Sequence, residues 1–202
     1  MKGFDMWDQR YAAPGYLFGK EPADYLIQQA AHLPAAANVL CVADGEGRNS
    51  SYLAGLGHQV TAFDPSDVAV DKARKLAAER GVSPDFNVAG VEDWDWTRQF
   101  DAVVAIFIQF APPEMRDRIF GWLAQAVAPG GLILLHGYAP RQVDYGTGGP
   151  PSKANMYTTD MLADAFADFE VLRLEDYDTE VDEGPGHSGL SALVDLVARK
   201  PV

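Results

Sequence analysis

The stretch LCVADGEGRNS, residues 40–50, decides the fold, because an apolar run passes directly into two glycines spaced G-x-G and then into polar residues. This order is typical of a strand that ends in a nucleotide-binding turn, from which a helix begins. Gly45 and Gly47 let the backbone approach a ligand closely. Ser50 stands at the third glycine position of the dinucleotide fingerprint, and no P-loop lysine follows. The turn therefore predicts a ligand site without naming the ligand.

The other strands and helices follow from the hydrophobic pattern. Apolar runs without strict alternation are typical of strands buried on both faces of a parallel sheet. Such runs occupy residues 37–43, 58–64, 84–89, 100–108 and 131–138. Amphipathic stretches predict helices at 22–33, 67–80, 115–126 and 159–166. We expect Ser66 to cap the second helix, Thr158 or Thr159 to cap the last, and the Pro-Gly-Gly at 129–131 to end the third.

The end of the chain carries a different pattern. Two long apolar runs, 169–181 and 190–200, are joined by a segment too short for a helical crossover, so they are expected to pair as an antiparallel hairpin. The sequence therefore predicts an α/β fold with five strand–helix units. Its sheet is a Rossmann-like doubly wound sheet of seven strands, five parallel strands plus the C-terminal antiparallel hairpin.

We interpret residues 1–202 as a single domain with four parts. Residues 1–35 form an N-terminal cover and helix, and residues 36–138 form the cofactor-binding strand–helix units. Residues 139–156 follow a strand's carboxyl end and are long for a connection, which predicts a substrate lid loop. Residues 157–202 supply a helix and the hairpin.

Composition and charge exclude several classes of protein. The net charge of −13 repels nucleic acid, whose binding depends on neutralising phosphates. The longest apolar runs are far shorter than the ~20 residues of a membrane span, and the N-terminus lacks the apolar core of a signal peptide. With one cysteine, no intramolecular disulfide is possible. We therefore expect a cytoplasmic protein without nucleic-acid or membrane partners. No metal site is predicted, and the sequence does not decide between monomer and homodimer.

Three further strand ends add to the first turn. Asp64 closes the second strand 20 residues after Asp44, where a carboxylate can accept both hydroxyls of a ribose; the alternative is that Asp64-Pro65-Ser66 only opens the next helix. Gly90, Val91 and Glu92 follow the third strand, where backbone groups would meet an adenine. Phe107 ends the fourth strand.

With these residues in place, the sequence resembles the class I S-adenosylmethionine-dependent methyltransferases of the small-molecule type, and most of all their tellurite-resistance-like branch. The resemblance is carried by WDQRY (7–11), YLFGKEP (16–22), ADGEGRNSSYLAGLGHQVTAFDPS (43–66), APGG (128–131) and YGTGGP (145–150). It implies S-adenosyl-L-methionine as cofactor and a small-molecule acceptor, with a soft nucleophile such as a thiol or oxyanion as one option. The cofactor-binding residues that we predict are Trp7, Tyr16, Gly19, Ala43, Asp44, Gly45, Glu46, Gly47, Arg48, Asn49, Asp64, Pro65, Ser66, Gly90, Val91, Glu92 and Phe107.

Cys41 departs from the family pattern, which commonly has an acidic residue at this position of the strand. Asp44 or Glu46, inside the turn, is then the substitute that would bring negative charge near the cofactor's ammonium or sulfonium group. Arg48 begins a helix, an unfavourable place for a cation, so we expect it either to meet a carboxylate, which would be the cofactor's or that of Asp44 or Glu46, or to remain exposed.

Methyl transfer gains much from proximity and from exclusion of water, and it needs no obligatory acid or base. The candidate catalytic residues are Tyr138, Tyr145 and His136, with Tyr145 in the expected lid. Two alternatives to an active methyltransferase remain. One is a non-catalytic module that binds S-adenosylmethionine or S-adenosylhomocysteine, and the other is a nicotinamide-dependent oxidoreductase.

Overall fold

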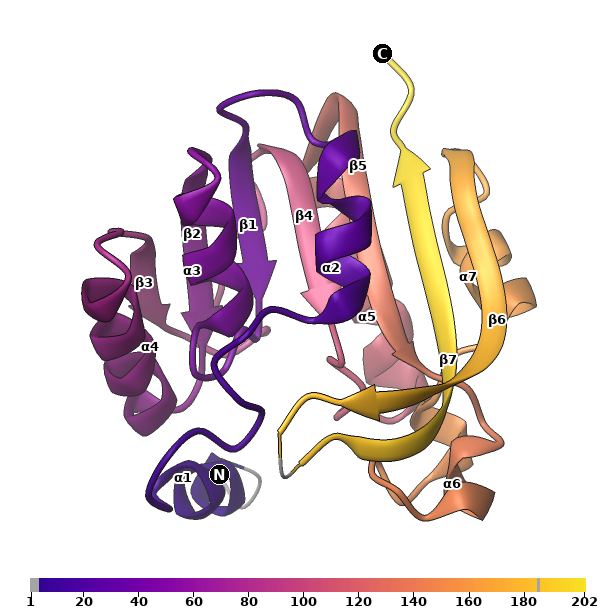
Figure 1. The fold of residues 1–202 in the computed structure, drawn as a ribbon. Coiled ribbons are helices and arrows are strands. Elements are labelled where there is room, and N and C mark those ends of the chain that lie inside the picture. The colour runs from indigo at the N-terminus through magenta and orange to yellow at the C-terminus, as the bar shows by residue number, and fades with distance from the viewer. Residues whose placement is uncertain (1–3, 185) are drawn as a thin grey trace.

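The computed structural model describes residues 4–184 and 186–202, with a seven-stranded sheet at its centre (Figure 1). The strands are β1 (Asn38–Val42), β2 (Gln59–Asp64), β3 (Asp85–Val88), β4 (Phe100–Ile106), β5 (Val127–Tyr138), β6 (Glu170–Asp182) and β7 (Ser188–Arg199). Their order is β3-β2-β1-β4-β5-β7-β6. Strands β1 to β5 are parallel, and β7 is antiparallel to both β5 and β6. The predicted sheet and its terminal hairpin are confirmed.

Helices cover both faces of this sheet (Figure 1). α2 (Asp24–Gln29), α3 (Arg48–Gly55) and α4 (Asp67–Glu79) form one layer, and α5 (Pro113–Ala126) and α7 (Thr159–Ala165) form the other. Along β1, Val39 and Cys41 join the buried cluster of α2 and α3, whereas Leu40 and Val42 join that of α5 and α7. Both faces of the strand are therefore apolar, as a doubly wound sheet requires.

Two helices, α1 (Phe4–Tyr11) and α6 (Gln142–Tyr145), lie at the edge where the parallel strands end (Figure 1). α1 lies beyond the carboxyl ends of β1 and β2, and α6 follows β5 (Figure 1). Two 3-10 turns span Ala30–His32 and Lys153–Asn155. None of the helices described combines the length and the hydropathy that crossing a bilayer demands.

Two of the predicted helix caps are present in the structure. The Ser66 hydroxyl accepts a hydrogen bond from the Ala69 amide at 3.1 Å, and the Thr158 hydroxyl accepts one from the Met161 amide at 3.2 Å. Each cap satisfies an amide that the first helical turn leaves without a partner.

Two expectations from the sequence are wrong. The third of the five expected strand–helix units has no helix, because residues 90–99, between β3 and β4, form turns. There, Trp94 and Trp96 fill the core beside Phe63, and the Trp96 indole donates to the Val91 carbonyl at 2.7 Å. The Pro-Gly-Gly at 129–131 lies within β5, because α5 already ends at Ala126.

The hairpin and the N-terminus meet over the carboxyl edge of the sheet. The far ends of β6 and β7 curve toward α1 (Figure 1). We call residues 183–184 and 186–187 the hairpin tip and residues 4–22 the N-terminal cover. The Gly186 amide donates to the Leu17 carbonyl at 3.0 Å, which joins the two segments. A side chain at Gly184 would lie 2.5 Å from the Gly19 nitrogen, so their close approach requires glycine.

Candidate cofactor and active site

A cavity of about 740 Å³ opens at the carboxyl ends of β1, β2, β4 and β5, beneath the N-terminal cover and the hairpin tip. In open α/β sheets this edge is the usual ligand site. The predicted residues that line the cavity are Trp7, Ala43, Asp44, Gly45, Arg48, Asn49, Asp64, Pro65, Gly90, Val91, Glu92, Phe107 and Tyr138. The predicted residues outside its lining are Tyr16, Gly19, Glu46, Gly47, Ser66, His136 and Tyr145.

The two positions of the first turn require glycine for different structural reasons. Gly45 has φ +59°, and a Cβ there would lie 2.9 Å from the Tyr11 hydroxyl at the cavity. Gly47 has φ +81°, and a Cβ there would lie 2.5 Å from the Cβ of Ala73 on α4. Gly45 therefore keeps the cavity open, whereas Gly47 allows the turn to pack on a helix.

Two carboxylates, the half-buried Asp44 and the buried Asp64, line the cavity at neighbouring strand ends. Asp44 accepts a hydrogen bond from the Ser50 hydroxyl at 2.5 Å, and burial raises the pKa of its carboxyl group to about 7. Asp64 accepts from the amides of Gly45 and Ser66, both at 2.9 Å, and burial raises its pKa to about 6. Their partners are hydroxyl and amide groups, which carry no full positive charge. Burial therefore dominates both pKa values.

Cys41, which stands where related sequences commonly have an acidic residue, is part of the core. Cys41 is 1% exposed and pairs in register with Ala62 on one side and Val104 on the other. Burial raises the pKa of its thiol well above the ordinary value. The negative charge at the end of β1 therefore comes from Asp44.

Glu46 does not face the cavity, although it neighbours residues that do. Its carboxylate pairs with the Lys72 ammonium at 2.9 Å and accepts from the Leu17 amide at 2.7 Å. The Tyr16 hydroxyl donates to the Lys72 carbonyl at 3.3 Å. Glu46 and Tyr16 thus fasten the N-terminal cover to α4.

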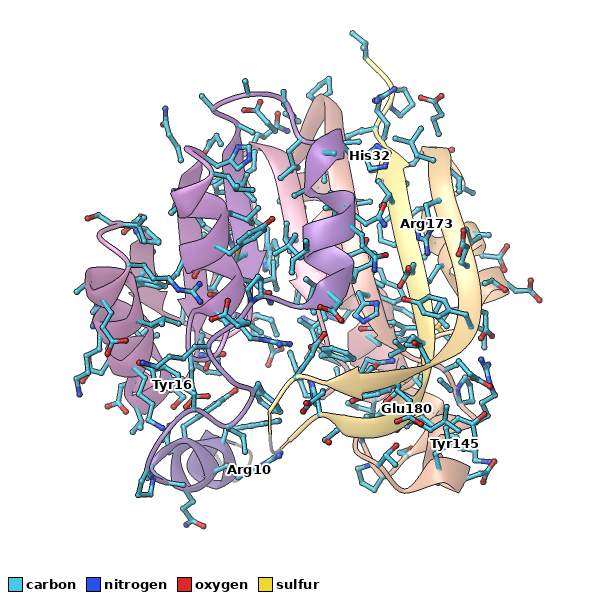
Figure 2. The ribbon with its side chains drawn as sticks, in the orientation of Figure 1. Arg10, Tyr16, His32, Tyr145, Arg173 and Glu180 are labelled. Carbon is cyan, nitrogen blue, oxygen red and sulfur yellow. The ribbon has the colours of Figure 1, made fainter. Side chains whose placement is uncertain are left out.

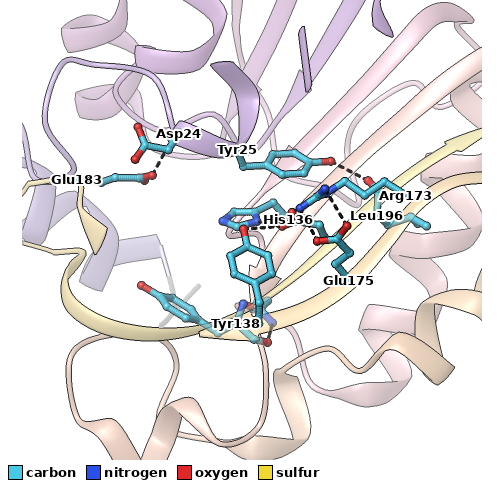
Figure 3. A network of polar contacts seen from close by, with 11 residues as sticks. Asp24, Tyr25, His136, Tyr138, Arg173, Glu175, Glu183 and Leu196 are labelled. Atoms are coloured by element: carbon cyan, nitrogen blue, oxygen red, sulfur yellow. Dashed lines mark hydrogen bonds and ion pairs between the residues drawn. The ribbon is translucent and has the colours of Figure 1, made fainter. Parts of the chain in front are cut away.

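Arg48 pairs with a carboxylate, but the partner is Glu183 from the hairpin tip and neither Asp44 nor Glu46, the partners expected within the protein. Their side chains are 7% and 8% exposed, and Arg48 Nη2 lies 2.7 Å from Glu183 Oε2. The Asp24 amide also donates to Glu183 at 3.1 Å (Figure 3). Burial alone would raise the pKa of Glu183, but His187, Arg48 and the Asp24 amide outweigh it and lower that pKa to about 2.

Two of the three candidate catalytic residues lie outside the cavity lining. His136 Nδ1 contacts Asp195 Oδ1 at 2.7 Å, and its ring stacks on Tyr25 in a buried polar network that includes Arg173 (Figure 3). The Tyr145 hydroxyl donates to Asp178 at 2.8 Å, beside α6 (Figure 2). These contacts account for both side chains without a substrate.

Tyr138, the third candidate, borders the cavity with its ring. Gln109 holds this residue in place, because its side-chain amide donates to the Tyr138 carbonyl at 2.7 Å and accepts from the Tyr138 amide at 2.6 Å. The neighbouring Phe107 has a φ of +55°, which is strained for a bulky residue. Strain of this kind persists where surrounding structure enforces it, and it gathers at functional sites.

Some cavity residues escaped the sequence-based prediction. Arg10, Tyr11 and Phe18 come from the N-terminal cover, and His187 comes from the hairpin tip. The first three belong to the WDQRY and YLFGKEP motifs, from which the sequence singled out Trp7, Tyr16 and Gly19 instead. His187 is 7% exposed and lies between two aromatic rings, a position that no local pattern signals.

Comparison with known proteins agrees with this geometry. Residues 39–131 match the family described as a methyltransferase domain. A ubiquinone biosynthesis O-methyltransferase of Xanthomonas axonopodis pv. citri (strain 306) is 38% identical over 104 residues, covering 50% of this chain and 43% of that protein. The match thus spans less than half the length of this curated relative.

Solved structures share the fold at low sequence identity. A protein from work on the conversion of a disulfide bond into a thioacetal group during echinomycin biosynthesis has a TM-score of 0.79 at 21% identity, covering 98% of this chain and 91% of that one. TehB from Haemophilus influenzae has a TM-score of 0.70 at 20% identity, covering 88% and 61%. Residues 39–131 are therefore similar to a methyltransferase domain, and the chain shares the fold of these solved structures.

Proposed function

We propose that this chain transfers a methyl group from S-adenosylmethionine to a small, largely apolar acceptor. The observation that carries the proposal is the pair of carboxylates, the half-buried Asp44 and the buried Asp64, in the cavity lining next to a segment similar to a methyltransferase domain. Burial outweighs the groups that lower their pKa values, Arg48 among them for Asp44, so a cationic group bound beside Asp44 would favour its ionised form.

The residues present fit that cofactor. Asp64 uses one lone pair of each oxygen for an amide, so both oxygens retain acceptor capacity for ribose hydroxyls. Asp44 suits the ammonium group, and the amino end of α3 suits the carboxylate. Pro65 and Val91 offer apolar contact for the adenine. When bound, S-adenosylmethionine supplies an electrophilic methyl group on a sulfonium.

The other end of the cavity suits an apolar acceptor. Phe18, Phe107, Phe110 and Met115 border it, together with the ring of Tyr138. The N-terminal cover and the hairpin tip shield this end from water. Apolar walls orient the acceptor, and the exclusion of water keeps its nucleophilic atom desolvated for transfer.

Titration calorimetry and turnover distinguish this function from its alternatives. We expect S-adenosylmethionine and S-adenosylhomocysteine to bind, NADH not to bind, and S-adenosylhomocysteine to accumulate, by mass spectrometry, with some members of a panel of phenols and thiols. Binding without turnover across the panel would favour the non-catalytic module. Binding of NADH alone would favour the oxidoreductase.

A pair of glycine variants tests the location of the site. Gly45→Ala places a methyl group beside the Tyr11 hydroxyl, and it should weaken S-adenosylhomocysteine binding by about tenfold or more, which is about 1.4 kcal/mol. Gly57→Ala is the matched control, because Gly57 also has a positive φ, of +92°, but has open space around it. Equal affinity in the two variants would place the cofactor elsewhere.

A further inference from the structure

The imidazole of His187 occupies a distinct position at the acceptor end of the cavity. Its ring centroid lies 4.4 Å from that of Phe18 and 4.2 Å from that of Phe107, and Tyr138 meets it edge-on at 5.7 Å. The ring borders the cavity and is 7% exposed. These three neighbouring rings crowd the imidazole and restrict the directions from which a ligand can approach it.

One edge of this ring is turned toward a carboxylate. His187 Nδ1 lies 3.9 Å from Glu183 Oε2, and this buried nitrogen has no hydrogen-bond partner among residues 4–184 and 186–202. Arg48 and the Asp24 amide hold Glu183 in place. A gap of this length is common before a ligand binds and tightens a catalytic contact. Because the two ring nitrogens point in different directions, this contact leaves Nε2 as the nitrogen available to the cavity.

We propose that His187 is the general base of the methyl transfer, that Glu183 positions it, and that the acceptor is therefore an apolar molecule carrying a weakly acidic O–H or S–H group. The proposal rests on the proposed function and adds the acceptor's chemical class to it. Glu183 favours the tautomer with the proton on Nδ1, which presents the Nε2 lone pair to the acceptor.

Charges around the ring keep it neutral and ready to accept a proton. Burial lowers the pKa of His187 below the ordinary 6.5, and Arg48 on α3 and His136 on β5 act in the same direction. Glu183 alone opposes them. Tyr138 on β5 and Phe18 in the N-terminal cover also face the ring, as uncharged groups. The base is therefore unprotonated at neutral pH and is lost as the pH falls below its pKa.

In the proposed methyl transfer, His187 Nε2 accepts the acceptor's proton as the oxygen or sulfur lone pair of the acceptor forms a bond to the methyl carbon. The carbon–sulfur bond of the methyl donor breaks, and its electron pair stays on sulfur. The imidazolium then releases the proton to water, and no oxidant or reductant takes part.

Two probe acceptors separate base catalysis from structural support. Phenol, with a pKa of about 10, needs its proton removed, whereas 4-nitrothiophenol is already ionised at neutral pH. We expect His187→Gln to slow methylation of phenol by about 100-fold or more and to change that of 4-nitrothiophenolate by less than about threefold. His32→Gln is the control, because His32 is exposed at the opposite end of the sheet (Figure 2).

Several results would overturn the proposal. One is an equal loss of methylation rate with both probes in His187→Gln. Another is a wild-type enzyme that methylates the thiolate but not phenol. A third is a wild-type enzyme that binds S-adenosylhomocysteine but methylates neither probe. Failure to bind S-adenosylhomocysteine would instead refute the proposed function. With phenol as the acceptor, the wild-type methylation rate should fall as the pH drops below 6.5. In His187→Gln this decrease should be absent.

A measurement without turnover gives an independent answer. In the S-adenosylhomocysteine complex at pH 7.5, the imidazole ¹⁵N shifts of His187 should show Nδ1 protonated and Nε2 unprotonated. In Glu183→Gln the share of the Nε2–H tautomer should rise. A cationic ring, or a wild-type ring protonated on Nε2, would overturn the assignment.

Discussion

The carboxylates of Asp44 and Asp64 in the cavity lining and that of Glu183 at the hairpin tip are balanced in opposite ways. Asp44 and Asp64, at the ends of β1 and β2, have pKa values raised to about 7 and about 6. Glu183, at the hairpin tip, has a pKa lowered to about 2. Burial raises the pKa of all three carboxyl groups, so burial does not explain the difference. The partners do, since the aspartates meet neutral donors and Glu183 meets the Arg48 guanidinium.

The difference indicates two kinds of construction. Where the chain closes on itself, the charge of the carboxylate is balanced within the protein, and the contact holds the hairpin tip over the cavity. Where a cationic ligand is proposed to bind, negative charge is left unbalanced at a cost in stability. Substitutions at the two places should therefore change stability in opposite directions.

The largest effect is expected from Glu183→Gln. This change leaves the Arg48 guanidinium buried without a counter-charge, and removing one partner of a buried ion pair costs about 3–5 kcal/mol. The free energy of unfolding, from urea titration at pH 7, measures the loss. Glu180→Gln is the matched control, because Glu180 is exposed on β6, three residues before Glu183 (Figure 2).

The pH dependence sharpens this prediction. The pKa of Glu183 is lower in the folded protein than its ordinary value of 4.5, so its stabilising contribution is present above pH 4.5 and is lost as the pH falls toward 2. The difference between wild type and Glu183→Gln should shrink over that interval. A difference that stays constant would mean that the ion pair contributes little.

Asp44→Asn should have a smaller effect of the opposite sign. The pKa of Asp44 rises on folding from 3.8 to about 7, so the wild type loses stability as the pH rises through that range. Without ligand at pH 8, we expect the variant to be more stable by about 2–4 kcal/mol, and by less at pH 5. Affinity for S-adenosylmethionine should fall in the same variant.

An exposed carboxylate provides the comparison for Asp44. Asp71 on α4 has a side chain that is 68% exposed, and Asp71→Asn should shift stability by no more than about 0.5 kcal/mol. If Asp44→Asn proves no more stable than this control, the carboxylate is balanced by a group that the ligand-free structure does not reveal.

The smallest expected effect is a proton released on binding. At pH 7, Asp44 is about half protonated, and a cationic group beside it would favour the ionised form and release about half a proton. Titration calorimetry in phosphate and in Tris measures this number. The ligand's own amino group titrates in both proteins, so the difference between wild type and Asp44→Asn reports Asp44. Equal proton numbers in the two proteins would contradict the assigned contact.

The sequence predicted the parts of the site that are local along the chain. The first turn and Asp64 lie at consecutive strand ends, and parallel strands bring such ends to the same edge. Glu46 and Tyr145 show the limit of this reasoning. Both lie in segments that border the cavity, but the direction of each side chain depends on partners elsewhere, Lys72 on α4 and Asp178 on β6.

The sequence by itself determined the doubly wound sheet, the terminal hairpin and the edge where a ligand binds, because hydrophobic period, turn residues and strand order are encoded locally. Only the tertiary structure decided that Arg48 pairs with Glu183, 135 residues away, and that His187 enters the cavity. Such contacts depend on where the hairpin curves and on how the N-terminal cover packs beneath it. The balance of charge around the cavity, from which the proposed chemistry follows, is therefore a property of the assembled fold.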